Sequence, residues 1–338
     1  MIAAAPRFGL ILPNRGVVIG ATTVGEMLEL GELADAGPWE SLWVGDSLLA
    51  KPRLDAITLL SALAARTKRV RLGVSCMAST PIRDPLLLAY QWSSLDHLSG
   101  GRTVFVACQG GGPGSGDFAH ELETFGVERD SRMQRMEEAV EILRLTSSAE
   151  HVSYEGRYTR FRDVTIAPRP VQRPLPIWIA ANPDMTRPRN VEKAYRRVAR
   201  LGDGWQTTHT PPDDVRRSLA LIETYAAEIG RALTSSFEVS VCSNICVNDD
   251  RDAAFAEAKR FLDLHSDADY TPDFLATWVA VGSAADCRAY LRRFIDVGAT
   301  TILLRLSSFD QRRQFEVVTE KVIAPLLALG RPRPASVL

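Results

Sequence analysis

Short apolar runs alternate with amphipathic stretches along most of this chain. Between Ser41 and Gly112, three apolar runs each end in small or polar residues, and the stretches 53–65 and 85–98 between them place apolar residues at helical spacing. The runs lack a strict alternation of apolar and polar positions, which is typical of parallel strands covered on both faces. The pattern therefore predicts a fold in which crossover helices join parallel strands.

The same alternation continues through the rest of the chain. Eight core strands are predicted, which is the number in a closed (β/α)8 TIM barrel, and roughly 250 residues suffice for such a barrel. We therefore expect one α/β domain over residues 1–338, with the surplus length in insertions at about 108–130, 150–172 and 266–282. The predicted strands are 8–12, 41–44, 70–74, 103–107, 176–180, 204–207, 237–247 and 300–306.

The insertions depart from this pattern in different ways. A glycine-rich run at 110–116 lacks the Lys-Ser/Thr pair of a phosphate-binding P-loop, and we interpret it as a mobile lid over a site. The turn-rich, aromatic stretch 152–172 predicts a hairpin. The stretch 266–282 is predicted to be irregular, and its aromatic residues suit either packing of the insertion or the wall of a substrate site. These aromatic residues are Tyr270, Phe274 and Trp278.

Composition and charge exclude several classes of protein. The 338 residues carry a net charge of −1, with 46% hydrophobic and 24% charged residues, which gives no sign of nucleic-acid binding. No apolar run approaches membrane-spanning length, and the first residues lack a signal-peptide pattern, so we expect a cytoplasmic protein. Five cysteines in a chain of this size favour reduced thiols over a disulfide framework. No strand end carries paired histidines or clustered carboxylates, so no metal site is predicted.

Candidate site residues stand where the predicted strands end, because barrels of this kind carry their chemistry at the carboxyl ends of the strands. Asp46 either lines a site or caps the next turn, and Cys108 is either a small buried hydrophobe or a group that faces a ligand. Two roles are open for His209: it either serves a ligand as an acid, a base or a hydrogen-bond donor, or it forms hydrogen bonds only with the backbone of its loop. Arg305 suits a phosphate contact or an ion pair with a neighbouring strand. Further polar or thiol groups at strand ends belong to Asn14, Ser47, Ser75, Cys76, Gln109, Asn182 and Thr208.

A series of motifs that covers nearly the whole chain resembles the bacterial luciferase-like superfamily of flavin- and deazaflavin-dependent oxidoreductases. The resemblance implies a (β/α)8 barrel that holds the flavin ring at the carboxyl ends of the strands. It also implies a non-proline cis peptide bond between Ser75 and Cys76. The motifs are Trp43-Val-Gly-Asp-Ser47, Arg66-Thr-Lys-Arg-Val-Arg-Leu-Gly73, Asp84-Pro-Leu-Leu-Leu-Ala89, Leu95-Asp-His-Leu-Ser-Gly-Gly-Arg102, Tyr154-Glu-Gly-Arg-Tyr158, Arg169-Pro-Val-Gln-Arg-Pro-Leu-Pro-Ile-Trp178 and Arg200-Leu-Gly-Asp-Gly-Trp205.

The chain departs from the family pattern at several strand ends. The run from Phe105 to Gly110 resembles the Phe-x-x-Cys-Arg-Gly of luciferases, whose Cys lies beside the reactive carbon of the flavin and whose Arg holds its phosphate, but Gln109 replaces that Arg. Ser47 stands where many members carry a His, so the usual catalytic imidazole is absent. Gly111 and Pro211 stand where deazaflavin reductases often place a Glu and a Lys, which counts against a sugar-dehydrogenase-like enzyme.

The resemblance implies a flavin-dependent monooxygenase that acts on a small organic substrate with oxygen and reduced FMN. A separate flavin reductase would supply the reduced FMN, and the chain would form a homodimer. Asp46, Cys108 and His209 are then expected to be catalytic, and the other residues named above at strand ends, including Arg305, to contact the cofactor. One alternative is a reductase or dehydrogenase that transfers hydride with the deazaflavin coenzyme F420. An alternative of another class is a non-catalytic flavin-binding protein.

Overall fold

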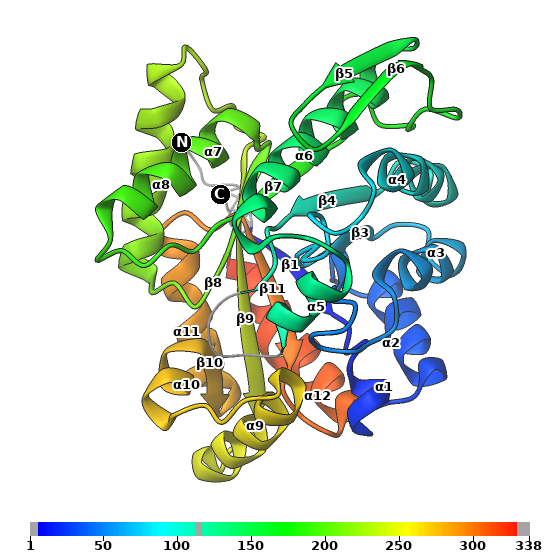
Figure 1. Ribbon diagram of the computed structural model, residues 1–338. Helices are drawn as coiled ribbons and strands as arrows, with labels where there is room; N and C mark the ends of the chain where they lie inside the picture. Colours follow the sequence, from blue (N-terminus) through cyan, green and yellow to red (C-terminus); the bar gives the residue numbers. More distant parts are fainter. Residues whose placement is uncertain (1–5, 112–116, 330–338) are drawn as a thin grey trace, which may run out of the picture.

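The computed structural model describes residues 6–111 and 117–329, and it folds the predicted strands into a closed parallel barrel (Figure 1). Neighbouring strands pair in the order β9, β11, β1, β2, β3, β4, β7 and β8, and the pairing of β8 with β9 closes the ring. The predicted (β/α)8 barrel is thus confirmed. The strands are β1 Arg7–Ile11, β2 Ser41–Val44, β3 Arg71–Val74, β4 Thr103–Ala107, β7 Ile177–Ala180, β8 Gly204–Thr208, β9 Glu238–Val247 and β11 Thr301–Leu306.

Helices join the strands and cover the outside of the barrel (Figure 1). Their starts follow from local sequence: the Asp84 side chain accepts a hydrogen bond from the Leu87 N–H, and Pro85 occupies the first turn of α4, where no N–H is needed. The helices are α2 Val24–Ala36, α3 Ala56–Arg66, α4 Pro85–Ser99, α6 Arg132–Ser148, α7 Pro188–Leu201, α8 Pro212–Glu228, α9 Arg251–Ser266, α11 Ala284–Asp296, α12 Gln311–Val318 and α13 Ala324–Leu329, with a π-helical turn at Thr319–Ile323 between the last two.

Shorter elements occupy the insertions. The predicted hairpin is present as β5 Val152–Glu155 and β6 Arg160–Val164, which pair antiparallel. The prediction that 266–282 is irregular is wrong, because this stretch forms helix α10 Pro272–Trp278 and strand β10 Val279–Gly282. Strand β10 pairs with the second half of β9, whose ten residues extend beyond the barrel ring. Other short helices are α1 Gly16–Ile19, α5 Phe118–Thr124 and a 3-10 turn at Arg129–Ser131. Residues 112–116 of the predicted lid lie outside the described residues.

Two tryptophans fill the middle of the barrel. The ring centroids of Trp43 and Trp178 are 5.2 Å apart, and small residues on neighbouring strands make room for them. A Cβ atom at Gly73 would lie 2.2 Å from the Trp43 ring, and one at Gly204 would lie 2.6 Å from the Trp178 ring. The middle of the barrel is therefore packed solid and forms a floor for any site at its carboxyl end.

An ion cluster around the buried Glu238 closes the amino-terminal end of the barrel. The Glu238 carboxylate accepts two hydrogen bonds from Arg71, at 2.6 and 3.0 Å, and one from Thr301 at 2.8 Å. Arg7 lies 3.0 Å from the same carboxylate. This arrangement lowers the pKa of Glu238, with Arg71 as the main cause opposing burial. The end of the barrel that stays open is therefore the carboxyl end.

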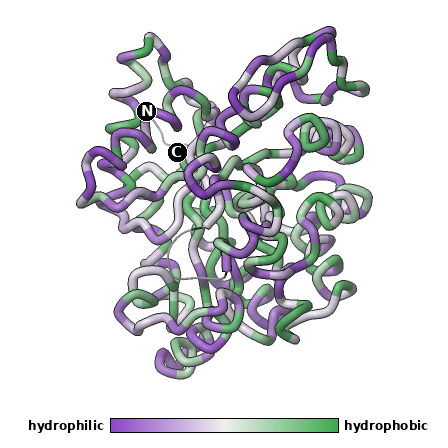
Figure 2. Tube along the Cα trace, viewed as in Figure 1, coloured by the Kyte–Doolittle hydropathy of each residue, from purple (hydrophilic) through white to green (hydrophobic). Residues whose placement is uncertain are grey.

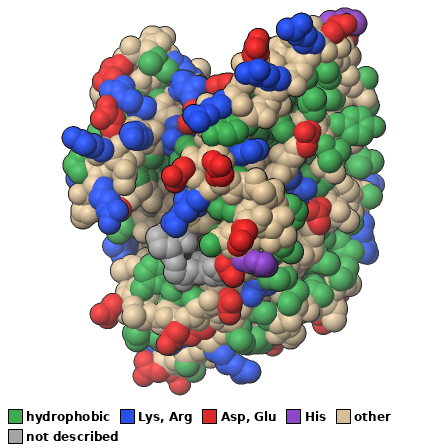
Figure 3. All heavy atoms as spheres, in the orientation of Figure 1, with side chains coloured by type: hydrophobic (Ala, Val, Ile, Leu, Met, Phe, Trp, Pro, Cys, Tyr) green, Lys and Arg blue, Asp and Glu red, His purple; other side chains and the backbone are tan. Residues whose placement is uncertain are grey.

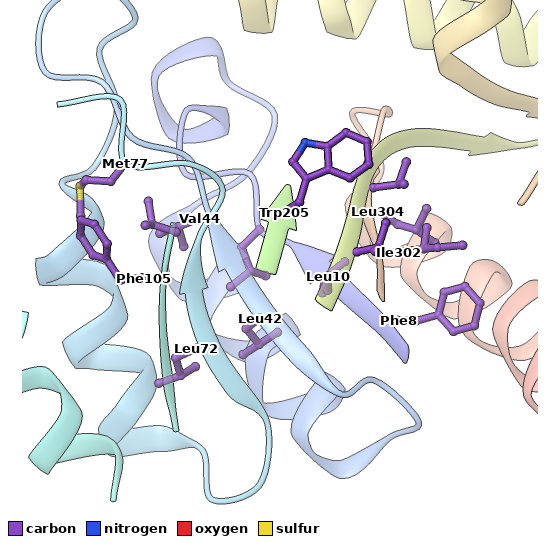
Figure 4. Packing of buried hydrophobic residues seen from close by; sticks show 14 of the residues in the cluster. Phe8, Leu10, Leu42, Val44, Leu72, Met77, Phe105, Trp205, Ile302 and Leu304 are labelled. Atoms are coloured by element: carbon purple, nitrogen blue, oxygen red, sulfur yellow. The ribbon is translucent and has the colours of Figure 1, made fainter. Parts of the chain in front are cut away.

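The main hydrophobic core lies between the barrel and the helices around it. Leu42 on β2, Leu72 on β3 and Phe105 on β4 are fully buried members of this layer and are labelled in Figure 4. Along the chain trace, the central strands are mostly hydrophobic or neutral, while outward helix faces carry most hydrophilic positions (Figure 2). Across the described residues, no helix combines the length and apolar character needed to cross a bilayer.

Candidate functional site

A cavity of about 740 Å³ opens at the carboxyl ends of the barrel strands. Small-molecule sites typically measure roughly 300–1,000 Å³, so this cavity suits a cofactor together with a small substrate. In Figure 3, Lys and Arg side chains stand on both sides of a notch between α7 and the arm built from α6, β5 and β6. Ten of the residues predicted from strand ends line the cavity: Asp46, Ser47, Ser75, Cys76, Cys108, Gln109, Asn182, Thr208, His209 and Arg305.

Asp46 lines the cavity, but its carboxylate is engaged by its own protein. One oxygen accepts a 2.7 Å hydrogen bond from the Ser79 N–H, and the other lies 3.5 Å from the Arg83 guanidinium. The side chain is 1% exposed. Burial raises the pKa of Asp46, and Arg83 opposes that shift. Asp46 therefore holds the turn after β2 in place and offers little of its carboxylate to a ligand.

Ser47 and Asn14 are likewise occupied in shaping the turn after β2. The Ser47 hydroxyl donates to Glu121 at 3.3 Å and accepts from the Lys51 N–H at 2.9 Å. The Asn14 amide donates to the Gly45 carbonyl at 2.8 Å and accepts from the Gly45 N–H at 3.1 Å. Asn14 does not line the cavity. Asn14 therefore lies beneath the loop that follows β2, and the prediction that it lines the site is wrong.

Three cysteines meet on the floor of the cavity. Cys76 on the segment after β3 hydrogen-bonds through its thiol to Cys108, which follows β4, and Cys242 on β9 lies 3.2 Å from the Ser75 hydroxyl. The hydrogen bond from Cys76 lowers the pKa of Cys108, helped by the Gly110 N–H, while the same bond and burial raise the pKa of Cys76. The peptide bond between Ser75 and Cys76 is cis, which confirms the prediction from the resemblance.

Neutral hydrogen-bonding groups complete the floor and one rim. Gln206 on β8 was not among the predicted residues; it lines the cavity, is 4% exposed, and its Nε2 has no hydrogen-bond partner within the described part of the chain. Asn182 and Gln109 stand at the rim beside β7 and β4, and the Asn182 amide lies 3.4 Å from the Thr208 carbonyl. An uncharged ring with carbonyl acceptors would suit this surface.

His209 stands on the cavity wall against an aromatic cluster. Its ring centroid lies 3.8 Å from that of Trp278 and 4.9 Å from that of Phe274. The imidazole is open to the cavity but closely surrounded by protein elsewhere, so burial lowers its pKa, and repulsion by Arg305 and Lys51 adds to this lowering. At neutral pH the ring is therefore uncharged and suited to hydrogen bonding more than to proton donation.

Three cations line the cavity within electrostatic reach of one another, and of these only Arg305 was predicted. Lys51 and Arg53 follow β2, and Arg305 projects from β11. Burial lowers the pKa of Lys51 to about 7, and repulsion by Arg53, Arg305 and Arg15 contributes. Burial also lowers the pKa of Arg53 to about 10. Lys51 and Arg53 lie five and seven positions after Asp46, so a basic pair soon after a strand end was the signal available in the sequence.

The residues that line the cavity fit a flavin or deazaflavin ring. Its floor combines small residues such as Ser75 and Ala180 with the unpaired Nε2 of Gln206, which can donate to a ring carbonyl. Both cofactors share that part of the ring, so this floor suits either. No group of three or more potential ligand residues for a metal ion occurs among residues 6–111 and 117–329.

Comparison with known proteins identifies the relatives of this chain. The family model described as luciferase-like monooxygenase matches residues 6–301. A monooxygenase from Streptomyces bottropensis of known structure is 25% identical and superposes with a TM-score of 0.76, covering 94% of this chain and 99% of that one.

Two curated relatives show how divergent the matches are. An uncharacterized protein of Mycobacterium tuberculosis is 32% identical over 193 residues, which span 57% of this chain and 60% of that protein. An F420-dependent glucose-6-phosphate dehydrogenase of Amycolatopsis mediterranei is 23% identical over 338 residues, which cover 90% of this chain and 95% of that protein. Neither level of identity fixes a cofactor or a substrate.

Proposed function

Because the chain belongs to the luciferase-like monooxygenase family, we propose that it is a two-component monooxygenase that uses reduced FMN and oxygen on a small organic substrate. Bound reduced FMN supplies the chemistry that activates oxygen. The chain's own part is to hold the ring, exclude water and orient the substrate.

The observation that carries this proposal is the lack of a poised acid or base at the end of β2. Hydride transfer to or from an alcohol needs a group that takes or gives the hydroxyl proton. Asp46 is committed to Ser79 and Arg83, and Ser47 is committed to Glu121 and a backbone N–H. Oxygen activation by a reduced flavin makes a smaller demand on side-chain proton transfer, so this site suits it better.

Named residues have distinct roles in this proposal. Cys76 and Cys108 would hold the ring from the floor, and Gln206 would donate a hydrogen bond to it. Phe118, Met133 and Met136 line the cavity near β4 and exclude water from it. Lys193 on α7 and Gln109, which follows β4, would hold the FMN phosphate.

A second candidate function is an F420-dependent dehydrogenase or reductase. The observation in its favour is the likeness to the Amycolatopsis mediterranei enzyme over 90% of this chain. His209 would then be the group closest to a base, since its neutral imidazole faces the cavity.

The proposal includes two partners. A separate flavin reductase delivers reduced FMN, and a second copy of the chain forms a homodimer. Helix α4 supports the dimer because Leu87, Tyr90 and Leu98 are 55%, 49% and 59% exposed and lie on one helix face.

Anaerobic titration separates the two candidate cofactors. Purified apoprotein is titrated with reduced FMN and, separately, with reduced F420, and binding is followed through the cofactor absorbance and the protein fluorescence. The proposal predicts at least tenfold tighter binding of reduced FMN. Tighter binding of F420 would contradict it and support the dehydrogenase.

A further inference from the structure

One side of the cavity carries a concentration of positive charge. Lys51, Arg53 and Arg305 line it at the ends of β2 and β11. Arg15, just after β1, is 8% exposed and acts electrostatically on Lys51 and Arg53 from behind the wall. Four cations from three adjacent barrel strands therefore converge on one region.

Two of the carboxylates near this cationic cluster, those of Asp46 and Glu121, form hydrogen bonds with other groups, although they also act electrostatically on Arg53. Asp46 is held by Ser79 and Arg83, as described above. Glu121 accepts hydrogen bonds from the N–H groups of Leu48 and Ala50, both at 2.8 Å. Asp267, at the end of α9, is exposed and acts on Arg15 and Lys51. The cluster thus keeps an excess of positive charge next to the cavity.

Several buried polar atoms beside the cluster have no hydrogen-bond partner anywhere in residues 6–111 and 117–329. They include Nδ1 of His265, which lines the cavity and is 6% exposed, and Nε and Nη1 of Arg15. Leaving such groups unsatisfied costs free energy, so proteins rarely keep them without a ligand or water to bind. Of these atoms, only Nδ1 of His265 belongs to a residue that lines the cavity, within electrostatic reach of Arg305 and Lys51, and it points to a ligand that forms a hydrogen bond there.

The loop that carries Lys51 and Arg53 is fixed before any ligand arrives. The Glu121 carboxylate holds its backbone from one side, and the Arg53 side chain bonds to the Lys51 carbonyl at 2.9 Å. A Cβ atom at Gly45 would lie 2.2 Å from an Arg53 guanidinium nitrogen, so the guanidinium packs directly on that glycine. A preorganised pair of cations binds an anion without the cost of ordering the loop.

An apolar wall stands next to the cluster. Tyr270 and Trp278 line the cavity with ring centroids 5.6 Å apart, and Phe274 stacks on Tyr270 at 5.1 Å. Tyr270 also lies near enough to Arg305 to influence its pKa. A molecule held by the cations would therefore rest its body against aromatic rings.

We propose that the substrate is an organic oxyanion, whose carboxylate, phosphate or sulfonate group binds Lys51, Arg53 and Arg305 and whose apolar body packs on Tyr270 and Trp278. The identification of this anion as the substrate rests on the proposed function. Arg305, which we expected to meet the cofactor phosphate, is reassigned to the substrate. FMN carries one phosphate, and the separate cation Lys193 on α7 is available for it.

Calorimetric titration with sulfate tests the cluster directly. Sulfate is titrated into the apoprotein and into the FMN-saturated protein, for the wild type and for Lys51→Met and Arg305→Met. We expect about tenfold weaker sulfate binding or more in each variant, as for the loss of one charged hydrogen bond. Arg216→Met, which removes an exposed cation on α8, should leave sulfate binding unchanged. Equal sulfate affinity in the wild type and both cluster variants would overturn the proposal.

Flavin binding by the same variants distinguishes substrate from cofactor. The affinities for FMN and for riboflavin, which lacks the phosphate, are compared in each protein. The proposal predicts that the cluster variants keep the wild-type preference for FMN, whereas Lys193→Met reduces it. Loss of that preference in Arg305→Met would assign the cluster to the cofactor phosphate and overturn the proposal.

Two further measurements keep the outcomes separate. Arg305→Lys keeps the positive charge and should keep most of the sulfate affinity. Circular dichroism checks that Arg305→Lys and Arg305→Met are folded. If both are folded and only Arg305→Met loses sulfate affinity, the loss is due to the missing charge. The sulfate titration of apoprotein needs no flavin. A protein that binds sulfate through the cluster but binds no FMN would contradict the proposed function while leaving the anion site standing.

Discussion

The Arg83 guanidinium lies 3.5 Å from the carboxylate of Asp46, whose side chain is 1% exposed. Arg83 also contacts Asp55 at 2.7 Å, so it ties the turn after β2 to the start of α3. This pairing offsets part of the cost of burying the Asp46 carboxylate beside the cavity. It also means that Asp46 contributes to the shape of the site more than to proton transfer.

Arg83→Met should destabilise the protein strongly, because it removes the cation that pairs with the buried Asp46 carboxylate and leaves it mainly the hydrogen bond from the Ser79 N–H. Removal of one member of a buried ion pair typically costs about 3–5 kcal/mol in the free energy of unfolding. The double variant Arg83→Met with Asp46→Asn should recover part of that loss. Urea unfolding followed by circular dichroism measures both. A loss below about 1 kcal/mol in Arg83→Met would show that the pair is not the anchor described here.

Gly73→Ala should destabilise the barrel interior, since the added methyl group would lie 2.2 Å from the Trp43 ring. Overpacking of a core typically costs about 1–3 kcal/mol. Gly25→Ala on α2 is the matched control, because a Cβ atom there would approach no atom more closely than the Thr23 hydroxyl, at 4.0 Å. Thermal unfolding of the two variants should give a lower midpoint for Gly73→Ala and an equal or slightly higher one for Gly25→Ala. Equal midpoints would argue against the tight packing around Trp43.

Much of this fold could be predicted from the sequence because most of its strands are short apolar runs and its helices show periodic apolar positions. Each of the eight barrel strands, including the run at 204–207, can be recognised from its own short stretch of sequence. Strand β10 was not predicted, because Val279–Gly282 follows directly on helix α10 with no turn to separate the two elements. It forms a strand because it pairs with the second half of β9, and this pairing exists only in the folded protein.

The residues of the candidate site could likewise be predicted only in part. The rule that chemistry stands at strand ends located Cys108, His209 and Arg305 on the cavity wall. This rule could not predict which side chains form their hydrogen bonds with other groups of the protein, as Asn14 and Asp46 do. Partners such as Arg83 and Glu121 come from distant parts of the chain, so only the assembled fold reveals those commitments.

Sulfate binding should weaken as the pH rises through about 7. The pKa of Lys51 is lowered to about 7, mainly by burial and also by Arg53, Arg305 and Arg15, with Asp267 opposing. Lys51 therefore loses its proton in this range, and the cluster loses one positive charge. Sulfate keeps its charge near neutral pH, so calorimetry between pH 6 and 8 reports on the protein. Lys51→Met should show a clearly flatter pH dependence; an unchanged dependence would exclude Lys51 as the titrating group.

The double variant Leu87→Glu with Leu98→Glu should separate the proposed homodimer. These side chains are 55% and 59% exposed on one face of α4, and paired charges buried in an interface without partners oppose association. Leu264→Glu, which changes a 47% exposed leucine on α9, is the matched control and should remain a dimer. Light scattering after size-exclusion chromatography measures the mass. A double variant with the mass of the wild-type dimer would place the interface elsewhere.

The most direct test of the proposed oxygenase is the reaction of its reduced flavin complex with oxygen. Protein in excess over reduced FMN is mixed with oxygenated buffer in a stopped-flow instrument, and the flavin absorbance is followed. The proposal predicts a first phase whose rate depends on the oxygen concentration and a second, slower phase that does not. A single phase identical to that of free reduced FMN, or a bound flavin that stays reduced in air, would contradict it.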